Sequence, residues 1–171
     1  MSWVMVDVEA DGPIPGDYSM VSVGAVKMEP EISKTFYAEM RPISDKWDSG
    51  ALDVCKFTRE QTLQFQEPLE AMRQFYLWLK KECGNHLFFI SDNAGFDWQF
   101  VNWYFHHFIG NNPFGFASTD QLSLYKGLIR DMYRNFKSKK YHPSHNALED
   151  ALANAKTLLE MKARYSLKIN W

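Results

Sequence analysis

Two carboxylates one residue apart stand near the start of the chain, inside an apolar run. Asp7 and Glu9 belong to the stretch 4–12, which reads Val-Met-Val-Asp-Val-Glu-Ala-Asp-Gly. Side chains alternate between the two faces of a β-strand, so both acids point to the same face as Trp3 and Met5, and the valines point to the other. Like charges this close repel each other and burial raises their pKa values, so we expect a cation or a proton between them.

Two more acids fall on predicted helices, and a histidine stands at or just before the start of one of them. Asp97 shares a helix face with aromatic and aliphatic residues, because residues three and four apart stack on one side. Asp150 lies among small residues that allow a close backbone approach, and His145 stands shortly before it. Each of them alone is more often a cap, a surface charge or a satisfied core hydrogen bond. Four carboxylates and one histidine together match what a pair of hard divalent cations requires for phosphodiester hydrolysis. Oxygen ligands suit Mg²⁺ or Mn²⁺, and a histidine can take the proton of an attacking water.

The bulk composition is that of one globular domain over residues 1–171. Hydrophobic residues make up 46% and aromatic residues 16% of the chain, which excludes a disordered protein. The net charge of −2 gives no global attraction to nucleic acid or to a membrane, so such a partner would need a local patch. Cys55 and Cys83 lack the spacing of a zinc site or a disulfide framework. Without a signal peptide or an apolar run long enough to span a membrane, we expect a cytoplasmic protein with no membrane partner.

Alternating apolar segments and helical patterns predict an α/β fold. Strands are expected in the opening stretch and at 20–28 and 34–41, followed by an irregular region at 42–57 in which Trp47 and Phe57 are candidates for the core. A helix start is expected at 58–61, helices at 68–83, 95–109, 119–133 and 146–164, and strands at 86–91 and 114–117. Strands first, then strands alternating with helices, indicate a mixed sheet covered by helices.

Three motifs in order resemble those of the DEDDh 3′-5′ exonucleases, in the ribonuclease H-like superfamily. They are Asp-Val-Glu at 7–9 with Asp-Gly at 11–12, Asn-Ala-Gly-Phe-Asp at 93–97, and His-Asn-Ala-Leu-Glu-Asp at 145–150. The histidine of the third motif stands where a sister group carries tyrosine. The segments around Trp47 and 58–65 look most like the small bacterial and phage exoribonuclease-like branch. The resemblance implies a mixed five-stranded sheet flanked by helices.

The resemblance also implies roles for the acids and the histidine. Asp7 would bridge two Mg²⁺ ions, for which Mn²⁺ could substitute. Glu9 and Asp150 would complete one metal site, and Asp97 would support the second, partly through water. His145 would be the general base.

Substrate contacts are implied next to the first two motifs. Ala10, Asp11 and Gly12 would lie against the terminal nucleotide, with Asn93 and Phe96 close by. Ala10 stands where many relatives carry a threonine that contacts the 3′ end, so the chain departs from the family pattern at this position.

Basic residues gather between 126 and 140, where six lysines and arginines accompany one acid, Asp131. Because phosphate contacts supply most sequence-independent affinity, we expect Lys137, Lys139 and Lys140 to hold the strand upstream of the scissile phosphate. The tryptophans of the aromatic helix could stack on bases, but aromatic residues at helical spacing are more often core.

The sequence therefore predicts a 3′-5′ exonuclease of single-stranded nucleic acid, with RNA favoured over DNA and nucleoside 5′-monophosphates as products. A DNA-directed proofreading or repair exonuclease shares every catalytic residue and stays an alternative. A relative that binds nucleic acid without hydrolysing it is the alternative from another class. Relatives are often homodimers, so a homodimer is possible.

Overall fold

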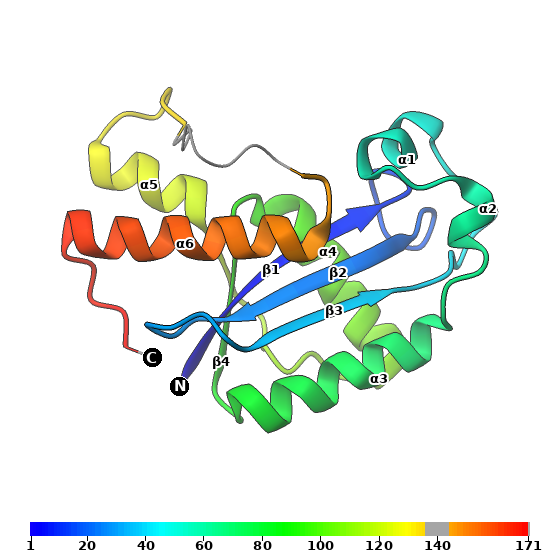
Figure 1. The fold of residues 1–171 in the computed structure, drawn as a ribbon, viewed down its shortest axis with the longest axis horizontal. Coiled ribbons are helices and arrows are strands. Elements are labelled where there is room, and N and C mark those ends of the chain that lie inside the picture. Colours follow the sequence, from blue (N-terminus) through cyan, green and yellow to red (C-terminus); the bar gives the residue numbers. More distant parts are fainter. Residues whose placement is uncertain (136–143, 171) are drawn as a thin grey trace.

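A mixed five-stranded sheet forms the centre of the protein, in the order β3-β2-β1-β4-β5 (Figure 1). The computed structural model describes residues 1–135 and 144–170. The strands are β1 (Ser2–Ala10), β2 (Met20–Lys27), β3 (Thr35–Glu39), β4 (Leu87–Ser91) and β5 (Ser118–Asp120). β1 is antiparallel to β2 and parallel to β4, β2 is antiparallel to β3, and β4 is parallel to β5. The expectation of a mixed ribonuclease H-like sheet is confirmed.

Helices cover both faces of the sheet (Figure 1). They are α1 (Ser49–Cys55), α2 (Arg59–Thr62), α3 (Pro68–Trp78), the π-helical η1 (Leu79–Cys83), α4 (Ala94–Tyr104), the π-helical η2 (Phe105–Ile109), α5 (Gln121–Ile129) and α6 (Ala147–Tyr165). The valines of β1 pack with α3, α4 and η2 in the larger core cluster. Met5, on the opposite face, packs against α6. Among the described residues, no helix combines the length and the apolar character that crossing a membrane requires.

Sequence patterns placed most elements, but four expectations were wrong. The region 42–57 contains α1, whose N-cap Asp48 accepts a hydrogen bond from the Ala51 amide at 3.1 Å, and Trp47 is 45% exposed instead of lying in the core. The strand expected at 114–117 is absent, because residues 113–116 form a turn in which Gly115 has a φ of 79° and its amide donates to the Asn112 carbonyl; β5 follows at Ser118–Asp120. The helix expected over 119–133 ends at Ile129, where Arg130 takes a left-handed conformation.

Gly24 of β2 lets α6 approach the sheet very closely. It pairs with Asp7 of β1. A Cβ atom on this glycine would lie 2.3 Å from the carbonyl carbon of Ala147, in the first turn of α6. The absence of a side chain therefore sets how near the start of α6 comes to the acidic part of β1.

Candidate functional site

The acids of the first two motifs meet where β1 runs past the end of β4. The two parallel strands pair only as far as Met5 and Ile90, which leaves the later amides of β1 without a ladder partner on that side. Asp97, from the first turn of α4, takes one of them: its Oδ1 accepts a hydrogen bond from the Val8 amide at 3.1 Å. The other oxygen of this 3% exposed side chain makes no hydrogen bond of standard geometry among the described residues, but hydrogen bonding to the Ser91 hydroxyl opposes the rise in the pKa of this carboxyl.

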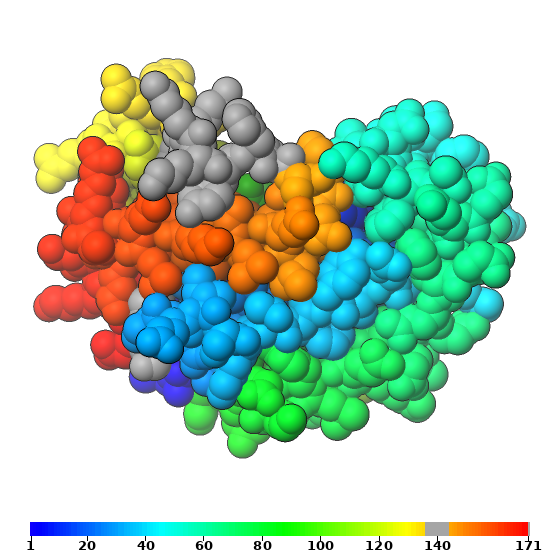
Figure 2. All heavy atoms as spheres, in the orientation of Figure 1, coloured from blue at the N-terminus to red at the C-terminus, as the bar shows by residue number. Residues whose placement is uncertain are grey.

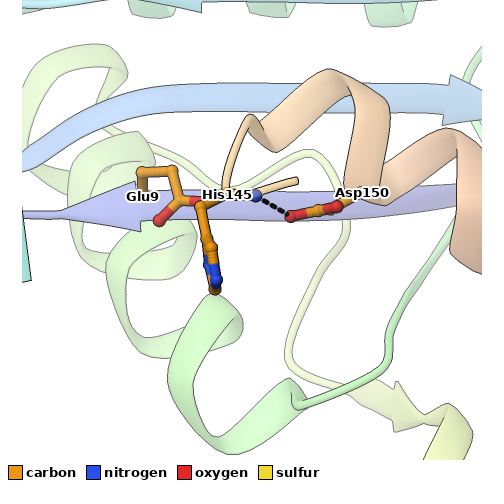
Figure 3. Close-up of side chains that lie close together, drawn as sticks. All are labelled: Glu9, His145 and Asp150. Atoms are coloured by element: carbon orange, nitrogen blue, oxygen red, sulfur yellow. Dashed lines mark hydrogen bonds between the residues drawn. The ribbon is translucent and has the colours of Figure 1, made fainter. Parts of the chain in front are cut away.

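The third motif forms the start of α6 and the turn before it. Asn146 is the N-cap and accepts hydrogen bonds from the amides of Leu148 and Glu149. Asp150 reaches back to the turn: its Oδ2 accepts from the His145 amide at 2.9 Å and its Oδ1 from the Ser144 amide at 2.8 Å. These bonds hold His145 in a left-handed conformation with a φ of 58°, and its imidazole projects from the turn beside Glu9 and Asp150 (Figure 3).

These elements bring the predicted residues into two clusters. One consists of Glu9, His145 and Asp150, and in it one potential ligand atom from each residue lies within 4.8 Å of the others. Figure 3 shows its members coming from β1, the turn before α6 and α6 itself.

The second cluster meets the same distance criterion and consists of Asp7, Asp92 and Asp97. All four predicted acids and the histidine thus lie in one cluster or the other. Asp92 was missed, although its position offers a signal: it directly follows a parallel strand, at the sheet edge where ligands bind in α/β proteins.

Burial and mutual repulsion raise the pKa values of these acids. The pKa of Asp7 lies well above its ordinary value because of burial first, and then because of the charges of Asp97 and Asp92. Burial and Asp92 likewise raise the pKa of Asp97. Burial, followed by the charge of Asp150, raises the pKa of Glu9 to about 7. The clusters therefore hold their full negative charge unfavourably, which a divalent cation would reverse.

The predicted contacts after the first motif are largely buried. The Ala10 side chain belongs to the core cluster. Asp11 is fully buried, and its carboxylate accepts hydrogen bonds from the Ser19 amide and, at 3.0 Å, from Arg59 of α2. Gly12 lies so close to the ring of Tyr18 that any side chain would overlap it. In this segment only the backbone remains available for a nucleotide.

The contacts expected at the second motif differ from each other. Asn93 is exposed at the N-cap of α4 and makes no capping hydrogen bond with its side chain. Phe96 is half-buried, packs against the core, and lies with its ring centroid 5.2 Å from that of Phe100. Lys137, Lys139 and Lys140 lie outside the described residues.

The surface is hollowed beside both clusters. Figure 2 shows a depression between α1 and the start of α6, with the N-terminal segment at its floor. Lys56 spans this region, since its Nζ donates a hydrogen bond to the Ser144 carbonyl at 2.9 Å. A separate pocket of about 600 Å³ is lined by residues between the starts of α4 and α5, Asp92, Asn93 and Asp120 among them.

Comparison with solved structures shows the same fold in known nucleases. The nuclease domain of 3′hExo, a DEDDh family member, aligns with a TM-score of 0.72 and 17% identity over 99% of this chain and 96% of that chain. The E. coli ExoI–ssDNA complex aligns with a TM-score of 0.75 and 13% identity over 96% of this chain. The present chain spans 41% of that exonuclease I chain.

Sequence comparison places the chain in a family. The model of the 3′-5′ exoribonuclease Rv2179c-like domain matches residues 2–162. The 3′-5′ DNA exonuclease Cap18 of Escherichia coli is 38% identical over 161 residues, which cover 87% of this chain and 85% of the relative. The chain therefore belongs to the Rv2179c-like 3′-5′ exoribonuclease family, whose members are hydrolytic nucleases.

Proposed function

We propose that residues 1–171 form a single exonuclease domain that removes nucleotides from the 3′ end of single-stranded RNA and releases nucleoside 5′-monophosphates. The observation that supports this most strongly is that carboxylates from β1, α4 and α6, buried in the case of Asp97 and half-buried in the others, gather in two clusters. Such an arrangement suits divalent cations, and a pair of cations is the usual requirement for hydrolysing phosphodiesters.

The donor set fits hard divalent ions. Carboxylate oxygens predominate in both clusters, and Mg²⁺ is the ion we propose, with Mn²⁺ as a substitute. Glu9 and Asp150 would hold one ion together with Asp7, and Asp97 would support the other. When bound, the ions would supply Lewis-acid activation of water and neutralise the charge of the phosphate.

His145 is the proposed general base. Its backbone is fixed through the Asp150 carboxylate, while its imidazole stays free of that hydrogen bond and reaches beside Glu9 (Figure 3). The ring would accept a proton from the water that attacks the terminal phosphodiester. The exposed Asn93 side chain and the backbone of residues 10–12 would contact the terminal nucleotide.

The names of the relatives point to both nucleic acids. The family description specifies RNA, and Cap18 is named as a DNA exonuclease. The test is digestion of matched RNA and DNA oligomers, labelled at the 5′ end, with Mg²⁺ and identification of the released products. Faster shortening of RNA supports the proposal, and a marked DNA preference replaces it with the proofreading or repair alternative.

The variant Asp7→Asn tests the alternative that the chain binds nucleic acid without hydrolysing it. We expect this variant to lose at least about 100-fold in rate, because it removes the carboxylate shared by both ion sites. Mg²⁺ or Mn²⁺ should raise the melting temperature of the natural protein and raise that of the variant less. If neither protein shortens any substrate, the enzymatic proposal is wrong.

The basic segment is proposed to hold the upstream strand. Replacing Lys137, Lys139 and Lys140 with glutamine should flatten the dependence of affinity on salt concentration, because fewer counterions are released on binding. Arg73, Lys80 and Lys81 lie on α3 and η1, across the sheet from α6, and replacing these three is the matched control. An equal effect of the two triple variants would contradict the proposal. A homodimer stays a prediction, which sedimentation of the purified protein would test.

A further inference from the structure

Tyr37 of β3 lies on the same face of the sheet as the acids of β1, beside the start of α6. In the antiparallel register Asp7 pairs with Gly24, and Gly24 pairs with Tyr37. Residues paired in this way point to the same face, with their Cβ positions about 5 Å apart. The backbone of Ala147 lies directly over Gly24, and α6 contacts β3 as well as β1 and β2. The Tyr37 side chain is therefore directed at the first turn of α6.

The hydroxyl group of Tyr37 joins β3 to the N-cap of α6. It donates a hydrogen bond to Glu39 Oε1 at 2.8 Å. Burial, followed by this hydrogen bond, raises the pKa of Tyr37, and hydrogen bonding with Ser22 and Asn146 opposes the rise. Donors to the phenolic oxygen have this lowering effect. The Asn146 Oδ1 already accepts from two amides of α6, so its side-chain amide is the group that donates to Tyr37.

The segment that this contact reaches carries the general base of the proposed mechanism. His145 directly precedes Asn146 and has a left-handed φ of 58°. A residue other than glycine keeps such a conformation only where its surroundings hold it. The Asp150 carboxylate holds the turn from within α6, and Lys56 holds it from the end of α1. Tyr37 adds a contact from the sheet.

Resting on the proposed function, we infer that Tyr37 is a positioning residue for His145. Its hydroxyl fixes Asn146, and through this N-cap it fixes the backbone from which the imidazole projects beside Glu9. Because the effect passes through Asn146, loss of the hydroxyl should lower kcat and leave KM nearly unchanged. Neither Tyr37 nor its acceptor Glu39 belongs to any of the three motifs.

The test compares Tyr37→Phe with Tyr76→Phe in steady-state digestion of the oligomer that the natural chain shortens faster. Tyr76 is also half-buried but packs on the opposite face of the sheet, so its change should leave both kinetic constants unaltered. Tyr37→Phe should lower kcat about 3- to 10-fold, as the loss of one hydrogen bond does, with KM changed less than about twofold. An unchanged kcat would overturn the inference.

The acceptor of the hydroxyl offers a second pair of variants. Glu39→Gln keeps an oxygen that can accept from Tyr37, and Glu39→Met does not. The glutamine variant should therefore retain more of the natural kcat than the methionine variant. Equal kcat values of the two would overturn the inference even if Tyr37→Phe does not fold.

A double-mutant cycle with Asn146→Ser tests whether the effect passes through the N-cap. Serine keeps a capping oxygen but removes the side-chain amide. The combined variant should lose less in kcat than the product of the two single losses, because both changes remove the same hydrogen bond. A combined loss equal to that product would contradict a role exerted through Asn146.

Hydrogen exchange of the substrate-free protein measures the same contact without any activity. The amides of Ser144 and His145 are hydrogen-bonded to Asp150. Tyr37→Phe should make them exchange about 3- to 10-fold faster, because the turn opens more readily, and Tyr76→Phe should not. Unchanged exchange in Tyr37→Phe would overturn the inference. If exchange responds as expected but the natural chain digests no substrate, the proposed function is refuted and the contact between β3 and α6 stands.

Discussion

Replacing Gly24 with alanine should displace the start of α6 and impair catalysis. The new Cβ atom would lie 2.3 Å from the carbonyl carbon and oxygen of Ala147 and 2.4 Å from the Leu148 nitrogen, whereas ordinary contacts begin at 3.4 Å. These are backbone atoms, so no rotamer change relieves the overlap. The first turn of α6, or the strand below it, must move by about 1 Å.

The displacement acts on the residues on both sides of the contact. Asp150 and His145 are placed by this turn, and a misplacement of about 1 Å in a catalytic site can lower the rate about 100-fold. Overpacking of this kind also costs about 1–3 kcal/mol of unfolding free energy. We therefore expect Gly24→Ala to fold but to melt at a lower temperature than the natural chain. It should release nucleotides from labelled RNA about 100 times more slowly.

Gly127→Ala is the matched control. Gly127 lies within α5, and a Cβ atom there meets nothing within 4 Å. This change should leave the rate unaltered and stabilise the chain by up to about 1 kcal/mol, because alanine favours helix. A cooperative unfolding transition in circular dichroism separates a local displacement from global unfolding in the Gly24 variant. A Gly24→Ala protein with the natural rate would refute the close-approach reasoning.

Three further outcomes follow from the raised pKa of Glu9, from the ion pair between Arg59 and Asp11, and from the hydrogen bond that Lys56 donates to the Ser144 carbonyl. In EDTA, the free energy of unfolding should fall as the pH rises from 4.5 to about 7, since the raised pKa of Glu9 makes the folded chain bind more protons than the unfolded chain there; Mg²⁺ should reduce this slope in urea denaturation. Arg59→Met should destabilise by about 3–5 kcal/mol because it leaves the buried Asp11 carboxylate unpaired, and adding Asp11→Asn should recover part of the loss in the same denaturation assay. Lys56→Met should lower the rate about three- to tenfold by releasing the Ser144 carbonyl, with a cost of about 1 kcal/mol typical of one hydrogen bond, and steady-state kinetics would show a fall in kcat.

Each outcome has a result that contradicts it. A flat pH dependence in EDTA would mean that Glu9 is solvated like a surface acid. Equal stability of the single Arg59 variant and the double variant would show that Asp11 needs no cation beside it. A Lys56 variant with the natural kcat would show that the hydrogen bond from Lys56 to the Ser144 carbonyl has no effect on catalysis.

Local patterns were sufficient to predict which acids and which histidine come together in the two clusters. The alternation around Asp7 and Glu9 predicted their shared face, and the structure places them with Met5 opposite the valines. The helical stripe containing Asp97 and the cap before Asp150 are likewise local features, since each depends on spacings within a few residues. The four acids and His145 could thus be assembled from short motifs.

Features that depend on distant partners could not be predicted. Gly24 in isolation resembles a weak point in a strand, and only the approach of α6 explains it. Asp11 was expected beside the substrate, but its buried pairing with Arg59 joins residues 48 positions apart. Asp92 is one acid in a turn until β4 and α4 bring it beside Asp7. Each of these depends on tertiary contacts that no local spacing encodes.

If Asp150 and His145 have the proposed roles, the docking of α6 on the sheet also makes activity a measure of local unfolding. The helix supplies Asp150, yet it packs on β1 and β2, which lie more than a hundred residues earlier in the sequence. Contacts of such long range are slow to form, and cooperative units of a protein can open separately. A partly open chain whose sheet is intact but whose α6 has detached would lack Asp150 and the positioned His145. Loss of nuclease activity on mild denaturation should therefore precede loss of sheet structure, and incompletely folded chains would be unable to degrade nucleic acid.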